Sequence, residues 1–231
     1  FVTYLVNLIS VTNAMQLLIF IPAGAMLLTI MFDSRVGFYS TVIISLICGG
    51  LRGNDYTFTL MNIAAGAMAA YSVRDIKNRT QIFKSFLSIL LGYTITIIAF
   101  GLERYSSWEY IMLEFAFAGT SALISPVLTY GLLVFFEKLF KLTTDLTLVE
   151  MMSFDRPLLR ELSSTAPGTF NHSLNVSNLA EEAATAIGAN ALLTKVGAYY
   201  HDIGKTYTPE YFVENQRGDI NYHDKIKPED S

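Results

Sequence analysis

The sequence predicts an all-α protein, in which a polytopic bundle of membrane-spanning helices precedes a smaller helical region outside the membrane. Long apolar runs fill residues 1–140, which carry a net charge of +1, whereas residues 141–231 carry a net charge of −5. Beyond residue 168, apolar side chains recur with helical spacing. We therefore divide the chain into a membrane region at 1–140, a connector at 141–168 and a C-terminal region at 169–231.

The membrane region contains enough apolar sequence for five to six spans, since a helix needs about 20 mostly apolar residues to cross a bilayer. Apolar runs cover residues 14–32, 36–53, 56–73, 82–103 and 109–138, with a partial run at 1–12. The last run is long for one crossing and contains Pro126. It is therefore either one tilted helix or two joined segments.

Basic residues in short loops predict how the spans are oriented. Arg74, Lys77, Arg79 and Lys84 crowd one loop, which we expect to be cytoplasmic. Alternation then places residues after Lys138 on the same side. We expect a multi-pass protein of the plasma membrane, with lipid around its spans and its C-terminal region in the cytoplasm. The chain opens without Met inside an apolar segment, so we also expect it to be a fragment.

Composition excludes some functions. The acidic balance of residues 141–231 argues against binding to a DNA or RNA duplex, which normally requires a basic face. It does not exclude a small anionic substrate, because a metal ion can supply local positive charge. The only cysteine is Cys48, so there is no disulfide framework. Glu114, within a predicted span, has two interpretations. One places it on an ion or ligand path; the other, which we favour, places it near the outer interface beside Trp108 and Tyr110.

The sequence of the connector predicts two short helices. Asp145 begins one that runs through Met152, and Asp155-Arg156-Pro157 begins another that ends near Ser164, because Asp caps helices and Pro suits a first turn. Ala166-Pro167-Gly168 is then a break. These helices either transmit movement from the spans or serve as a packed spacer.

A pair of helices follows the connector. Residues 169–187 predict one helix, and His172 lies on its expected buried face, four residues before Val176. The rest of that face comprises Leu179, Ala180, Ala183 and Ile187. Gly188 ends this helix and Asn190 caps the next. The second helix directs Leu193, Val196, Gly197 and Tyr200 inward.

Helix lengths predict that two histidines meet. From His172 to Ile187 is about 22 Å, and from Asn190 to His201 about 16 Å back, at about 1.5 Å per residue. An antiparallel hairpin, drawn close at Gly197, returns His201 to the level of His172. With Asp202 these side chains offer nitrogen and oxygen donors that suit divalent metals. A single histidine on an apolar face, such as His172, is more often a hydrogen-bonded core residue than a metal ligand. His201-Asp202 alone also fits a simple helix end.

Three stretches carry a resemblance to a known family. The sequence AYYHDIGK surrounds His201-Asp202, APGTFNHSLNVSNLAEEAA precedes it and TPEYFVENQ follows it. Together they resemble the HD-domain metal phosphohydrolases. With the upstream spans, the chain is similar over nearly its whole length to the bacterial seven-transmembrane HD receptors. The characterised, PgpH-type members of that family hydrolyse cyclic di-AMP.

The resemblance implies a truncated all-helical HD domain that holds two divalent metal ions, typically manganese or iron. His172 matches the first metal ligand, and His201 and Asp202 match the HD pair, with Asp202 bridging the metals. Lys205 matches a family lysine that lies near the substrate phosphate. The alternative interpretation is that Lys205 is an ordinary solvated lysine. Asp202 and Lys205 are thus the expected catalytic residues.

The chain departs from the family pattern at several points. Asn171 stands where the family usually has a first histidine, and Tyr222 where it has proline. His223 does not match a metal ligand. The family supplies two further histidines and another aspartate downstream, which we expect beyond Ser231. We therefore expect this chain alone to be inactive.

The predicted function is a membrane-anchored, metal-dependent phosphodiesterase that converts cyclic di-AMP to linear pApA in second-messenger signalling. We expect its membrane part to regulate it, with coupling through the connectors of a homodimer. One alternative is a receptor whose HD region binds a nucleotide without turnover. Another is an HD hydrolase of a different phosphate substrate, such as ppGpp. The sequence has no Walker-type glycine-rich loop, so hydrolysis of NTP through a P-loop is not supported.

Overall fold

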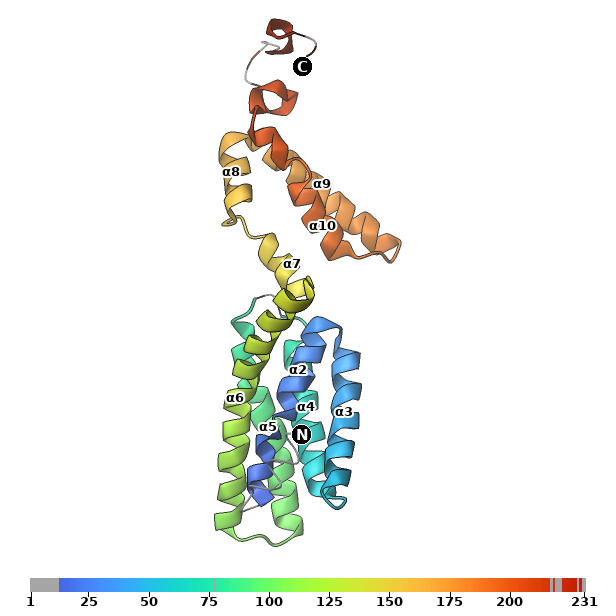
Figure 1. Ribbon diagram of the computed structural model, residues 1–231, viewed down its shortest axis with the longest axis vertical. Coiled ribbons are helices and arrows are strands. Elements are labelled where there is room, and N and C mark those ends of the chain that lie inside the picture. Colours follow the sequence, from blue (N-terminus) through green and yellow to red (C-terminus); the bar gives the residue numbers. More distant parts are fainter. Residues whose placement is uncertain (1–12, 77, 217, 219–221, 228, 230–231) are drawn as a thin grey trace. The chain divides into compact units, whose positions relative to one another are not determined.

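The computed structural model describes residues 13–76, 78–216, 218, 222–227 and 229, and these contain helices and turns but no strand. The predicted all-α class is confirmed. The chain forms two compact units, Phe1–Leu146 and Thr147–Ser231 (Figure 1). The partial apolar run at 1–12 lies outside the described residues.

The first unit is a helical bundle, and its described residues include four helical segments long and apolar enough to cross a membrane. They are Ala14–Met31, which comprises η1 (Asn13–Ile19) and α2 (Ile21–Met31), then α3 (Ser34–Leu51), α5 (Gln81–Glu103) and α6 (Trp108–Phe140). The expected span at 56–73 is also a helix, α4 (Tyr56–Val73), but it is not among these four. α4 packs against α2, α3 and α5, and many of its buried residues are small, such as Ala65, Gly66 and Ala69.

The last apolar run is one continuous helix. α6 has 33 residues with Pro126 inside it, which makes it about 50 Å long at 1.5 Å per residue. That exceeds the roughly 30 Å of a bilayer's hydrocarbon core. Near the proline, the Thr129 hydroxyl donates to the carbonyls of Ser125 at 2.8 Å and of Ala23 at 3.2 Å. The second bond ties α6 to α2.

Small residues let α4 and α5 approach closely. A Cβ added to Gly92 on α5 would lie 2.8 Å from the Ala65 Cα and 2.9 Å from the Ala64 carbonyl oxygen of α4. Beside this contact, the hydroxyl of Tyr93 donates to the Asn62 side-chain oxygen at 3.1 Å, with both residues fully buried. The two helices are therefore joined by close backbone packing and an internal hydrogen bond.

The basic loop between α4 and α5 lies at the same end of the bundle as the C-terminus of α6. Arg79 in this loop pairs with Glu137 on α6 at 3.1 Å. The Thr144 hydroxyl donates to the same carboxylate at 2.6 Å. Both charged side chains are mostly buried, at 20% and 11% exposure. The basic loop is thus fixed to the point where the chain leaves the bundle.

Glu114 is buried in the bundle, at 8% exposure. It lines a cavity of about 40 Å³ together with Asp55, Arg104 and Tyr110. The cavity therefore has polar and charged walls.

Both predicted connector helices are present. α7 (Asp145–Met151) begins in the first unit and ends in the second, and α8 (Pro157–Thr165) lies in the second unit. The prediction that Asp155 caps α8 is wrong, because Arg156 holds the capping position and its side chain makes no capping bond. Since Pro157 already sets the backbone of the first turn, the helix begins without one. The predicted break at Ala166-Pro167-Gly168 is shorter than expected, because α9 already begins at Pro167 and only Ala166 separates it from α8.

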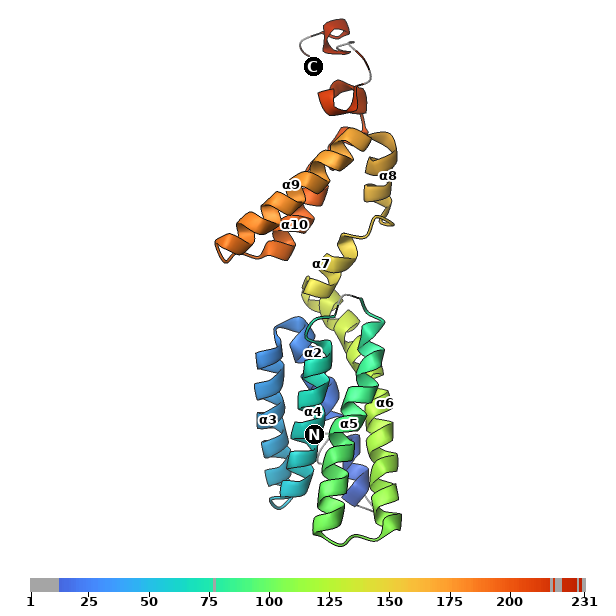
Figure 2. The ribbon, with the colours of Figure 1, turned by 180° about the vertical axis from the view of Figure 1, so that it is seen from behind.

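The two predicted helices of the C-terminal region are α9 (Pro167–Ala186) and α10 (Ala191–Tyr200), which lie side by side (Figures 1 and 2). Short 3-10 turns follow: η2 (Ile203–Thr206), η3 (Pro209–Tyr211), η4 (Val213–Asn215) and η5 (Tyr222–Lys225). Aromatic contacts hold the connector on the pair. The Phe154 ring lies 5.4 Å from the Phe170 ring and 6.1 Å from the Tyr199 ring.

The predicted turn between α9 and α10 is confirmed. Gly188 has φ 69°, a conformation that side chains disfavour. Its N–H donates to the Thr185 carbonyl and that of Ala189 to the Ala184 carbonyl, the pair of bonds of a Schellman motif. Asn190 then caps α10 by accepting from the Leu193 N–H at 2.9 Å. Both helix ends are satisfied locally.

The predicted inner faces of these helices are partly wrong. Leu179 and Ile187 are 68% and 81% exposed, and Leu193 is 54% exposed. The buried residues of α9 are instead small: Thr169, Ser173, Ser177 and Ala184. Small side chains permit close contact with α8, α10 and η4, which a stripe of large apolar residues would prevent. Gly197 does not mediate the approach, since a Cβ there would meet nothing within 4 Å.

The α4–α5 contact predicts that Gly92→Leu destabilises the bundle. The added side chain collides with backbone, and overpacking of this kind costs about 1–3 kcal/mol. We expect a clear drop in the thermal unfolding temperature of the full-length protein in detergent. The matched control is Gly119→Leu on α6, where a Cβ would have open space. Equal destabilisation by both substitutions would contradict the close packing.

Candidate metal centre

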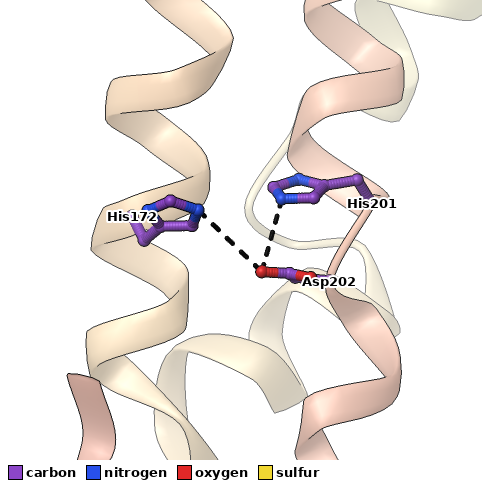
Figure 3. A group of neighbouring side chains, drawn as sticks. All are labelled: His172, His201 and Asp202. Carbon is purple, nitrogen blue, oxygen red and sulfur yellow. Dashed lines mark ion pairs between the residues drawn. The ribbon is translucent and has the colours of Figure 1, made fainter. Parts of the chain in front are cut away.

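His172, His201 and Asp202 converge at one point of the second unit. His172 lies in the second turn of α9, His201 directly follows α10, and Asp202 precedes η2. Figure 3 shows both imidazole rings directed toward the Asp202 carboxylate. The predicted meeting of the two histidines is thus present, although His172 is half-exposed and does not lie in a core.

The donor atoms surround one carboxylate oxygen. Oδ2 of Asp202 lies 3.3 Å from Nε2 of His201 and 4.0 Å from Nε2 of His172. One ligand atom from each of the three residues lies within 4.8 Å of the others. The histidine rings are 5.7 Å apart between centroids and tilted by 55°.

A backbone contact sets the tautomer of His201. Its Nδ1 lies 2.7 Å from the carbonyl oxygen of Ala198. A carbonyl oxygen only accepts, so Nδ1 carries the proton and donates. Nε2, which faces Asp202, is therefore the ring nitrogen available to bind a metal ion.

These donors fit a divalent metal ion. Two ligands with bonds of about 2.1 Å can lie no more than about 4.2 Å apart, so the observed spacings require only small side-chain adjustments. Two imidazoles and one carboxylate match the borderline and hard ions of the first transition row. The side-chain exposures of 47%, 38% and 20% leave the three residues accessible from solvent.

Lys205 joins the centre through Asp202. Its Nζ lies 2.8 Å from Oδ2 of Asp202 and 2.8 Å from Oε1 of Glu214. Partial burial opposes its charge, but the bonds to both carboxylates outweigh this and raise the pKa of Lys205. The bond from Lys205 in turn lowers the pKa of Glu214. The lysine and the Glu214 carboxylate are therefore charged near neutral pH.

Three residues at this site were missed by sequence reasoning. Asn215 accepts from the Thr169 N–H at 3.0 Å and donates to the Thr169 hydroxyl at 2.8 Å. That hydroxyl donates to Oε1 of Glu214 at 3.0 Å. Thr169 and the Glu214-Asn215 pair belong to the APGT and TPEYFVENQ stretches that carry the family resemblance. Those stretches were the available signal, but they did not indicate that the residues touch.

His223 lies outside this group. Its Nε2 is 2.8 Å from the Tyr211 carbonyl oxygen, and its ring is 5.2 Å from the Tyr211 ring. It is not one of the residues grouped at the metal centre. That His223 is not a metal ligand stays a prediction.

A bundle of membrane-length helices followed by a helical unit with a convergent His and His-Asp set defines a membrane-anchored HD-domain protein. The family described as "7TM receptor with intracellular HD hydrolase" matches residues 1–144, and the HD domain family matches residues 169–229. The chain belongs to the seven-transmembrane receptors with an intracellular HD hydrolase.

Curated relatives extend this comparison. The chain is 35% identical to "Cyclic-di-AMP phosphodiesterase PgpH" of Listeria monocytogenes over its full length, covering 33% of that protein. It is 34% identical to the protein of the same name from Bacillus subtilis, over 94% of the chain and 32% of the relative. An uncharacterised Synechocystis protein is 29% identical over 89% of the chain and 26% of its own length. The chain thus spans about a third of these relatives or less. No solved structure matches it.

The contact between α9 and η4 predicts the effect of Gly168→Ala. A Cβ on Gly168 would fall far inside contact distance of the Glu214 carbonyl oxygen, so the segment around Glu214 must move. We expect a loss of about 1–3 kcal/mol of stability and faster hydrogen exchange of residues 209–216 in the full-length protein. Gly197→Ala in open space is the control, neutral or slightly stabilising. Unchanged exchange in Gly168→Ala would contradict the contact.

Proposed function

We propose that this chain contributes the membrane region and the first part of the catalytic domain of a metal-dependent cyclic di-AMP phosphodiesterase. The observation that carries the proposal is the convergence of His172, His201 and Asp202 around one carboxylate oxygen. The name of the Listeria and Bacillus relatives supplies the substrate and the reaction. On this proposal, one phosphodiester bond of the cyclic dinucleotide is opened and the product is linear pApA.

We assign His172, His201 and Asp202 as metal ligands and Asp202 and Lys205 as catalytic residues. Two divalent ions, manganese or iron, would supply positive charge for the phosphate oxygens and lower the pKa of a water molecule. His201 presents Nε2 because its Nδ1–H is bound to a carbonyl. Among the three proposed ligands, Asp202 supplies the negative charge. The Asp202 side chain is 20% exposed, so it stays in contact with solvent.

The domain division that we propose is a membrane region at 1–140, a connector at 141–168 and an HD region at 169–231. We place the HD region in the cytoplasm and the spans in the plasma membrane. The ion pair between Arg79 and Glu137 supports this orientation, because it holds the basic loop at the end of the bundle from which the chain leaves. The homodimer stays a prediction.

The metal assignment predicts that His201→Ala and Asp202→Ala each reduce the bound manganese of the full-length protein. Loss of a metal ion removes several kcal/mol of transition-state stabilisation, so kcat/KM for cyclic di-AMP should fall by roughly 100-fold or more. Metal content is measured by mass spectrometry and hydrolysis by chromatography. Cyclic di-GMP and ppGpp are assayed in parallel to identify the substrate.

His223→Ala is the matched control, since this histidine bonds a backbone carbonyl away from the centre. It should keep both metal and activity. Wild-type metal content in His201→Ala and Asp202→Ala would contradict the ligand assignment. Hydrolysis of ppGpp but not of cyclic di-AMP by the wild type would contradict the substrate.

A further inference from the structure

A chain of polar contacts connects the first turn of α9 to the Asp202 carboxylate. It runs from Thr169 to Glu214, from Glu214 to Lys205 and from Lys205 to Asp202. We propose that Glu214 is a positioning residue of the metal centre, which holds Lys205 and balances its charge so that Asp202 stays aligned and available to a cation. This inference rests on the proposed metal site and assigns Glu214 a role in it.

Three contacts determine the position of the lysine. Its ammonium lies 2.8 Å from each carboxylate and 4.7 Å from the centre of the Phe212 ring. A lysine side chain is flexible and, when solvated, adopts many conformations. Here it is only 21% exposed. An ammonium held between two carboxylates and a ring is a fixed part of the site, in contrast to a solvated lysine.

The charge of Glu214 matters because Lys205 touches a ligand oxygen. Without a second carboxylate, the ammonium would neutralise Asp202 and repel an incoming cation at close range. With Glu214 present, the lysine has its own counter-charge. The group of Asp202, Lys205 and Glu214 then keeps a net charge of −1, which attracts a divalent ion.

Glu214 is itself held by the helix that carries His172. Thr169, in the first turn of α9, donates its hydroxyl to Glu214, and Asn215 accepts the Thr169 N–H. Asn215 thus satisfies a free N–H at a helix start that has no side-chain cap of its own. Gly168 lets the Glu214 backbone lie against this turn. Glu214 therefore links the helix of one ligand to the lysine bound to another.

A role confined to anchoring η4 on α9 is the competing explanation. Anchoring would act through Thr169 and Asn215 and would not depend on Lys205. The positioning role acts through Lys205, so it disappears when the lysine is absent. A double-mutant cycle in metal affinity separates the two.

The test measures the apparent Kd for Mn²⁺ of the metal-depleted full-length protein by electron paramagnetic resonance titration. Residues that orient metal ligands typically change affinity by about 10- to 100-fold when replaced. We expect Glu214→Gln to weaken Mn²⁺ binding by about 10-fold or more in the wild-type background. In the Lys205→Met background the same substitution should weaken it by less than about threefold, because the charge that Glu214 balances is gone.

Glu210→Gln is the control, because this exposed carboxylate lies on the same segment but outside the polar chain. It should leave Mn²⁺ affinity within about twofold of the wild type, as expected for a surface substitution. Glu214→Ala is the second variant if Glu214→Gln does not fold, with the same expected pattern. Equal weakening in both backgrounds, or none in either, would overturn the positioning role.

The outcome of the Mn²⁺ titrations does not depend on which substrate the enzyme hydrolyses. A wild-type protein that fails to hydrolyse cyclic di-AMP overturns the proposed function, while the Mn²⁺ cycle still tests Glu214. Conversely, active wild-type protein with no coupling between Glu214 and Lys205 overturns this inference alone.

Discussion

The tight turn between α9 and α10 is the constraint on which the candidate metal centre depends. One candidate ligand lies on α9 and the other two follow α10, so they meet only if the helices run back in register. Gly188 at φ 69° and the Asn190 cap fix where the turn begins and ends. A shift of one residue in α10 would rotate His201 by about 100° around the helix axis. The turn thus determines which side chains face one another.

Local signals made this part of the fold predictable. A glycine after the last helical residue and an asparagine before the next helix act through their own backbone neighbours. The position of the hairpin therefore followed from the sequence, and helix lengths were enough to bring His201 near His172. To predict the position of the His-Asp pair, it was enough to know that the pair follows the end of α10. The roles of these residues, however, came from resemblance and remain proposals.

Other features were not predictable because they depend on packing between distant segments. Periodicity assigned the large residues Leu179 and Ile187 to the core, but the small residues Ser173 and Ser177 are buried instead. Close contact with several neighbours selects for small volume, which a hydrophobic pattern does not register. Glu214 and Asn215 lie in a short 3-10 turn without periodicity, so their contacts with Thr169 gave no local signal.

The metal assignment is tested most directly by anomalous diffraction from crystals of the full-length protein grown with Mn²⁺. If these residues bind the metal, an anomalous peak will be bonded to Nε2 of His172, Nε2 of His201 and the carboxylate of Asp202. A manganese peak bound elsewhere, with these three side chains outside its coordination sphere, would contradict the assignment.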